Sequence, residues 1–185
     1  MKVGLTVDAA GTQSDFNTLL ELLKDFKIKS TFFVEVKLHP SLLKLIYKNG
    51  HEIGNHGYGH RMHSKLGQED NRVEIEKTHN IVKDILGIDM VYFAPPSGDY
   101  NEDTLKVAEE LGYRTILWNV DTIDWRNDST YSKIIERVLK KPLKGSIVLM
   151  HPKKETVKAL DHLIQSINNK NIKVGTVTDV LKPLD

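Results

Sequence analysis

The feature that most constrains the fold is a regular alternation of short apolar runs with longer segments of helical periodicity. Runs rich in β-branched and aromatic residues are each followed by a segment whose apolar residues recur every three or four positions. Neither a Pro/Ser-rich linker nor a low-complexity segment interrupts this order. Alternation of this kind is typical of parallel βα units packed around one core. We therefore predict an α/β fold of mostly parallel strands, in a single domain that spans residues 1–185.

The expected strands are short, and three of the six expected helices are followed closely by a glycine, Gly50, Gly87 or Gly112. Strands are predicted over 3–7, 30–36, 51–53, 90–94, 114–120, 146–150 and 173–177. Helices are predicted over 15–26, 40–47, 69–86, 102–111, 131–140 and 156–169. The longest helical pattern, 69–86, is followed by Gly87, a residue that suits the left-handed position after a helix.

The segment Gly50–His63, GHEIGNHGYGHRMH, holds four of the eight histidines of the chain. Gly54, Gly57 and Gly59 interrupt it, and each disfavours a helix interior by about 1 kcal/mol, so we predict a loop that follows a short strand. His56 and His60 could place two imidazoles on one metal ion, because imidazole suits zinc, cobalt, nickel or iron. Taken alone, the pair also fits two structural or surface histidines. A catalytic zinc normally takes three protein ligands, so a third must come from elsewhere in the chain.

Other polar residues with potential chemistry also follow predicted strands. Asp8 follows the first strand, the Pro95–Gly98 segment follows the fourth, Asp121 and Asp124 follow the fifth, and His151 follows the sixth. In a barrel of parallel strands the carboxyl ends share one face, where active sites collect. The sequence therefore predicts that these residues converge, although an aspartate at such a place can also be a turn former or a helix cap.

Charge and composition exclude several classes of function. The 26 basic and 25 acidic side chains leave a net charge of +1, which gives no electrostatic reason to expect a nucleic acid or an anionic membrane as partner. Cysteine is absent, which excludes disulfides and thiolate chemistry. No apolar run approaches the roughly 20 residues of a membrane span. The N-terminal MKVGLTVD predicts a strand and no signal peptide, so we expect either a cytoplasmic protein or the catalytic part of a longer exported one. We also expect a monomer.

Six segments together resemble one known family. They are LTVDAAG at 5–11, TFFVEV at 31–36, GHEIGNHGYGH at 50–60, FAPPSGDYN at 93–101, WNVDTIDW at 118–125 and GSIVLMHP at 145–152. In this order they resemble the polysaccharide deacetylases, carbohydrate esterase family four, also called the nodulation-factor deacetylase homology domain. The D-A-A in the first segment resembles a subset of that family. The resemblance implies a distorted (β/α)7-type barrel and metal-assisted removal of N-acetyl groups from N-acetylglucosamine units of peptidoglycan or chitin-like polymers, outside the cell or at its wall.

The resemblance also implies catalytic roles. His56 and His60 would hold a divalent metal, zinc above all, with cobalt or nickel as alternatives. Asp8 matches the general base that takes a proton from the attacking water. His151 matches the general acid that protonates the leaving amine, and Asp124 matches the carboxylate that orients this histidine.

The same resemblance assigns the residues that would hold the substrate. The backbone N–H of Ser97, after Pro95 and Pro96, would stabilise the oxyanion of the tetrahedral intermediate. Trp125 and Leu149 match the apolar walls of the acetyl pocket, although both residue types are more often part of a core.

Two positions depart from the family pattern. Ala9 stands where the family has the aspartate that serves as third metal ligand, and Ala94 stands where it has the arginine that pairs with the catalytic aspartate. Either Asp8 or additional waters would then complete the coordination of the metal. A catalytically impaired glycan-binding paralogue is therefore the first alternative to an active deacetylase, and a barrel hydrolase for another amide or ester is the second.

Overall fold

The computed structural model describes residues 1–9, 13–35 and 38–182, and the chain divides into two compact units. The first unit comprises residues 1–32, 49–52 and 118–185, and the second comprises residues 33–48 and 53–117. The chain passes between them within two strands, β2 (Thr31–Val34) and β3 (Glu52–Asn55).

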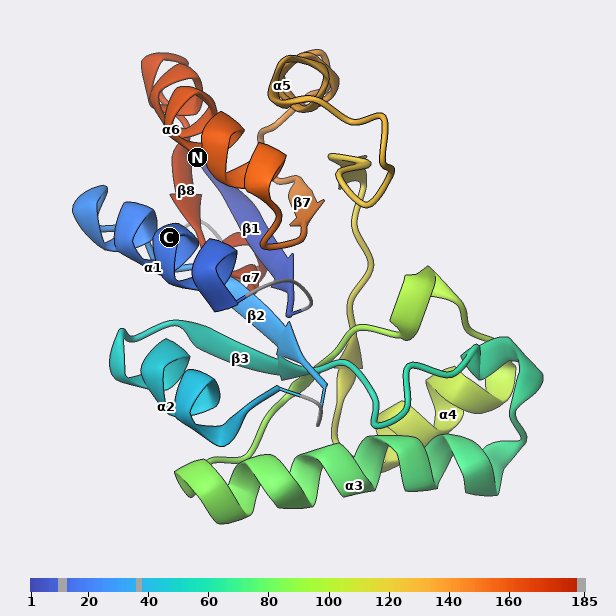
Figure 1. Cartoon of the computed structure of the whole chain (residues 1–185). Coiled ribbons are helices and arrows are strands. Elements are labelled where there is room, and N and C mark those ends of the chain that lie inside the picture. The colour runs from blue at the N-terminus through green and yellow to red at the C-terminus, as the bar shows by residue number, and fades with distance from the viewer. Residues whose placement is uncertain (10–12, 36–37, 183–185) are drawn as a thin grey trace. The chain divides into compact units, whose positions relative to one another are not determined.

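The first unit is built on parallel strands around β1. Its strands are β1 (Lys2–Asp8), β6 (Val120–Asp121), β7 (Ile147–Met150) and β8 (Lys173–Gly175). β1 pairs in parallel with β7 and β8, and β6 pairs with the other edge of β7. Its helices are α1 (Gln13–Asp25), α5 (Tyr131–Leu139), α6 (Lys154–Asn169) and α7 (Val177–Leu181). α6 contacts both α5 and α1, as Figure 1 shows.

β1 is buried on both faces, as expected of a central parallel strand. Val3, Leu5 and Val7 are each no more than 5% exposed, and Thr6 on the opposite face donates its hydroxyl proton to the carbonyl of Val148. In the pairing register Val7 lies opposite Met150. Asp8 and His151 are the next residues along the two strands, so they lie at the same carboxyl end of this neighbouring pair.

The second unit carries the shorter strands β4 (Tyr92–Phe93) and β5 (Arg114–Thr115), in the parallel order β2-β3-β4-β5. Its helices are α2 (Pro40–Lys48), α3 (Gln68–Leu86) and α4 (Glu102–Glu110), and α3 contacts both others. Figure 1 shows α3 as the long helix beside α4. Two 3₁₀ turns, His63–Lys65 and Pro96–Gly98, complete the unit.

The predicted α/β class with parallel strands is confirmed, and every predicted helix exists with ends within two residues of the expected ones. Gly87 ends α3 at φ 70°, in the left-handed conformation that glycine adopts without steric cost, and its N–H bonds the Lys83 carbonyl. The expected strand 30–36 is observed as β2, and its last residue, Val36, lies outside the described residues.

Three predicted strands are wrong in extent, and of 90–94 only Tyr92–Phe93 forms a strand, β4. The run 114–120 is two short strands, because β5 pairs with β4 whereas β6 pairs with β7. Between them, the N–H of Ile116 bonds the Phe93 carbonyl of β4 and the N–H of Asn119 bonds the Ile147 carbonyl of β7, so the two ends of this link follow different strands. The run 173–177 ends at Gly175. Thr176 then caps α7 by accepting the Asp179 N–H, while the Asp179 carboxylate accepts the Thr176 N–H. This T-x-x-D capping box overrides the β-branched composition of the segment.

Candidate active site

Residues 56–62, here called the histidine loop, connect β3 to the 3₁₀ turn His63–Lys65 in the second unit. They form neither helix nor strand, as predicted, and His56 is the first of them. His56 is 2% exposed, and its backbone N–H bonds the Val34 carbonyl of β2. Its Nδ1 lies 2.8 Å from the Ala94 carbonyl oxygen. Because a carbonyl only accepts, the proton is on Nδ1 and Nε2 carries the lone pair, which is the tautomer that ligates a metal.

His60 brings a second imidazole to the same place. It has φ 52°, a left-handed conformation that histidine adopts more readily than most residues. The ring centroids of His56 and His60 are 5.3 Å apart, and the rings meet edge to face. The two predicted metal ligands are therefore neighbours, and the side chain of His60 is 43% exposed to solvent.

Glu35, one residue beyond β2, completes a cluster that sequence reasoning missed. Its Oε1 lies 3.7 Å from Nε2 of His60. Glu35, His56 and His60 each present one ligand atom, and these atoms lie within 4.8 Å of one another. Two imidazoles and one carboxylate are a donor set that suits zinc, so the residues present fit a divalent metal. The available sequence signal was a single acidic residue directly after the buried strand Thr31–Val34.

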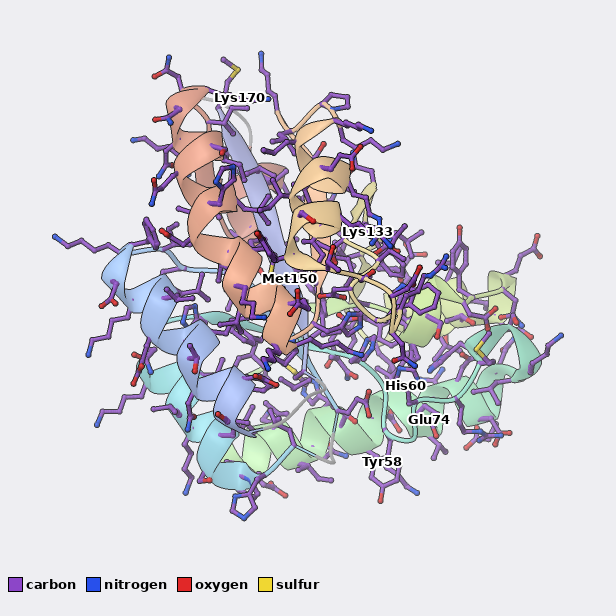
Figure 2. All side chains as sticks on the ribbon, turned by 45° about the horizontal axis from the view of Figure 1, so that its top comes forward. Tyr58, His60, Glu74, Lys133, Met150 and Lys170 are labelled. Atoms are coloured by element: carbon purple, nitrogen blue, oxygen red, sulfur yellow. The ribbon has the colours of Figure 1, made fainter. Side chains whose placement is uncertain are left out.

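Side chains of helix α3 hydrogen-bond the backbone of the histidine loop. Oε2 of Glu74 accepts the backbone N–H groups of Tyr58 and Gly59 at 3.1 and 2.7 Å. The hydroxyl of Thr78 donates to the carbonyl of Gly57. Figure 2 shows Tyr58, His60 and Glu74 in this region. Glu74 is 5% exposed, so the bonds that order the residues before His60 are shielded from water.

The predicted oxyanion donor lies in the 3₁₀ turn that follows β4. Pro95 and Pro96 are buried, whereas Ser97 is exposed and has φ 57°. The N–H groups of Gly98 and Asp99 close the turn on the carbonyls of Pro95 and Pro96. The turn thus fixes the backbone around Ser97, as a preorganised donor requires.

In the first unit, Asp124 and His151 form a closely bonded pair. Nδ1 of His151 donates to Oδ1 of Asp124 at 2.7 Å, and the His151 backbone N–H donates to Oδ2 at 2.7 Å. The Thr156 hydroxyl gives Oδ2 another hydrogen bond. The Asp124 side chain is fully buried, so one carboxylate fixes both the ring and the backbone of the histidine.

The charges of this pair stabilise each other. Burial opposes the charged form of His151, but the hydrogen bond and the charge of Asp124, together with the charge of Asp8, raise its pKa above 6.5. Burial likewise opposes the charge of Asp124, and the bonds from His151 and Thr156 outweigh it, so the pKa of Asp124 lies below its usual value. A protonated imidazole oriented by a buried carboxylate is the arrangement of a general acid.

Asp8 is the last residue of β1, and Oδ2 of Asp8 lies 4.0 Å from Nε2 of His151. Ala9 follows it, 8% exposed, and an alanine methyl cannot ligate a metal. Trp125 is 55% exposed, whereas Leu149 is buried in β7 at 4%. Within the first unit the structure thus brings Asp8 and Asp124 to the two ring nitrogens of His151.

Two other histidines, His51 and His63, have structural surroundings. His51 accepts the Ser30 backbone N–H, and burial together with the charge of Lys29 lowers its pKa to about 4. His63 is fully buried, and its Nδ1 lies 2.7 Å from Oδ1 of Asn71.

Comparison with known sequences shows the family of this chain. The family model "Polysaccharide deacetylase" matches residues 1–116. A peptidoglycan-N-acetylglucosamine deacetylase of Bacillus cereus is 31% identical over 98% of this chain and 68% of its own length. YlxY of Bacillus subtilis, described as uncharacterised, is 36% identical over 97% of this chain, and the match spans only 57% of YlxY. The chain belongs to the polysaccharide deacetylase family.

Solved structures share the fold. A protein from Bacillus anthracis described as a CE4 family pseudoenzyme is 35% identical and superimposes with a TM-score of 0.94 over 98% of this chain and 65% of that one. A mutant of the same protein is described as having restored enzymatic activity. The predicted fold class, a distorted (β/α)7-type barrel of mostly parallel strands, is confirmed. Among the described residues, no helix is long and apolar enough to cross a membrane.

Proposed function

We propose that this chain is a metal-dependent hydrolase that removes N-acetyl groups from N-acetylglucosamine units of peptidoglycan or a chitin-like oligomer. We further propose that residues 1–185 form the catalytic domain and act at the cell wall or outside the cell, where such glycans lie. Family membership and the deacetylase relative from Bacillus cereus support this proposal. The observation that carries it is the Asp124–His151 pair, an oriented acid that a simple glycan-binding module does not need.

His151 is proposed to protonate the nitrogen of the leaving amine through Nε2. Its raised pKa favours the protonated form that such an acid requires. Asp124 holds the ring by Nδ1, so that Nε2 is the nitrogen directed at the reaction. Asp8, as in the family pattern, is proposed to take a proton from the attacking water.

A divalent metal, most simply zinc, with cobalt or nickel as alternatives, would supply Lewis-acid polarisation of the amide carbonyl and acidification of water. His56 and His60 would hold it, and His56 is already in the required tautomer. The backbone N–H of Ser97 is proposed to donate to the developing oxyanion. Pro95, Pro96, Trp125 and Leu149 are proposed to shape the surroundings of the acetyl group, in line with the family pattern.

The test is acetate release from chitooligosaccharides and from peptidoglycan, after the purified protein has been stripped of metal and reloaded with zinc, cobalt or nickel. We expect release that depends on added metal and is lost on exhaustive chelation. Release that survives chelation would contradict the metal dependence. Turnover of small acetyl esters without any release from the glycans would favour a hydrolase of another specificity.

A second candidate function is a catalytically impaired glycan-binding paralogue. Ala9 and Ala94 favour it, because the family carries a metal ligand and a paired arginine at these positions. The pseudoenzyme from Bacillus anthracis is a relative for which impairment is stated. Binding of chitooligosaccharides without acetate release, measured by calorimetry on the metal-loaded protein, would establish this alternative.

A further inference from the structure

We infer that Glu35 is the third protein ligand of the metal, and that it replaces the carboxylate that the family places at position 9. The inference rests on the proposed metal dependence and goes beyond it, because it assigns a ligand that the family pattern does not contain. It concerns only side chains of the second unit.

Geometry is the first support. The ligand atoms of Glu35, His56 and His60 lie within 4.8 Å of one another, and Oε1 of Glu35 is 3.7 Å from Nε2 of His60. Tetrahedral zinc with ligands at about 2.1 Å requires these atoms to be about 3.4 Å apart. The cluster is thus slightly wider than a loaded site, and a small movement of His60 would close it. Such a movement is sterically open, because the His60 side chain is 43% exposed.

The surroundings of Glu35 are the second support. Its side chain is only 11% exposed, and the ion pairs among the described residues give it no lysine or arginine, only His60 at 3.7 Å. A carboxylate with so little access to water is stabilised by a cation placed beside it. A divalent ion held together with His56 and His60 provides that charge.

The framework is the third support. His56 is fixed by the Ala94 carbonyl, and the residues before His60 are fixed by Glu74 and Thr78. The His56 ring and the backbone that leads to His60 therefore have little freedom to lose on binding a metal, which favours affinity. Ala94, which lacks the family's arginine side chain, contributes here through its backbone.

Glu35 as a ligand would compensate for the alanine at position 9, where the family has an aspartate. A single carboxylate ligand from Glu35 gives the site the same charge and the same donor types as an aspartate at position 9 would give. Two histidines and one glutamate are a donor set of catalytic zinc sites. Asp8 is then not required as a ligand, and it can serve as the base beside His151.

A simpler interpretation is an ion pair between Glu35 and a protonated His60. It predicts that Glu35 affects the protonation of His60 but not the affinity for zinc. Zinc titration against a chromophoric chelator separates the two, with the wild type, Glu35→Gln and, as matched control, Glu76→Gln. Glu76 is an exposed glutamate of α3 in the same unit. Glutamine keeps the size of the side chain and removes its charge.

We expect one zinc per wild-type chain and per Glu76→Gln chain, and an affinity at least about 100-fold lower for Glu35→Gln, more than the usual cost of losing an outer-shell partner. The Co²⁺ absorption spectrum of Glu35→Gln should also change, since its ligand set changes. A Glu35→Gln protein that binds zinc as the wild type does would overturn the inference.

Stability measurements guard against a misfolded variant. The melting temperature of each protein is compared with and without zinc, so that each variant serves as its own reference. If Glu35→Gln does not fold without metal, Glu35→Asp replaces it and should bind zinc with intermediate affinity. Glu35-dependent zinc binding without acetate release would refute the proposed function and leave this inference standing. A wild type that binds no zinc would refute both.

Discussion

The acid–base residues of the first unit and the metal-ligand residues of the second unit differ in how completely they are formed. Asp124 is buried and takes three hydrogen bonds, so His151 is already in the position of an acid. Glu35 has a 3.7 Å contact with a half-exposed His60, and its cluster is wider than a loaded site. Hydrogen bonds within the protein already order the first set, whereas the proposed metal would draw the ligands of the second set together. Variants should therefore affect chemistry in one unit and metal affinity in the other.

The largest effect is expected from His151→Ala. Removing the acid should lower the rate of deacetylation by about 10²–10⁴-fold, the usual contribution of general acid catalysis. The affinity for zinc should not change, because the ligand set of the second unit is untouched. Acetate release and zinc titration on the same preparation measure both. His162→Ala is the matched control, since His162 is an exposed histidine of α6. Loss of zinc binding in His151→Ala would contradict the proposal that the first unit supplies the acid and the second unit binds the metal.

The next effect is expected from Glu74→Ala, which removes the acceptor of two loop N–H groups. Zinc affinity should fall by about 10–100-fold, as for other residues that orient a ligand through one intermediate group. Glu74→Gln should recover most of it, because an amide oxygen still accepts hydrogen bonds. Zinc titration and thermal unfolding of the metal-free proteins are the measurements. Equal zinc affinity in all three proteins would mean that the loop does not depend on α3.

A smaller effect concerns pH. The pKa of His151 is raised in the folded protein, so the stability that it contributes is fully present below its unfolded value of about 6.5 and is lost as pH rises through the folded value. The pKa of Asp124 is lowered, so its contribution is present above about 3.8 and is lost as pH falls through the folded value. The Asp124–His151 pair therefore stabilises the folded protein most between about pH 3.8 and pH 6.5.

Asp124→Asn tests this dependence. It removes the charge that supports protonated His151, so the fall in deacetylation rate at alkaline pH should begin at lower pH than in the wild type. The free energy of unfolding, measured with denaturant at several pH values, should also lose part of its dependence on pH between neutral and alkaline conditions. Unchanged profiles for both rate and stability would show that Asp124 does not set the protonation of His151.

The sequence predicts the fold class because strand and helix periods differ clearly over most of the chain. The prediction from sequence is wrong where the local residue pattern favours one structure and the hydrogen-bond partners favour another. Residues 114–120 look like one strand, but hydrogen bonding needs partners, and β5 and β6 have different ones. The β-branched end of the chain looks like a strand as well, but the capping box of Thr176 and Asp179 begins a helix there.

The candidate site divides in the same way. The sequence predicts roles for His56, His60, Asp8, Asp124 and His151 because they lie within dense motifs. Glu35 is missed because a single glutamate after a strand has no motif, and only the return of the chain as the histidine loop brings it to His60. The role of Ala94 is missed too. Its side chain indicates a lost arginine, while its carbonyl, which sequence does not distinguish from any other, orients His56.

The smallest effect is expected from Ala9→Asp, which restores the family's ligand. If Glu35 completes the metal site, an aspartate at position 9 adds no missing ligand and places a second negative charge next to Asp8 in the chain. Zinc affinity should then change by less than about threefold, or ~0.7 kcal/mol. Ala9→Asn, of equal size and uncharged, controls for crowding at this buried position. A gain of more than about tenfold for the aspartate alone would show that the natural site lacks a ligand, and so that Glu35 does not supply it. Because the same zinc titration also ranks Glu35→Gln, one series of variants decides which carboxylate the metal uses.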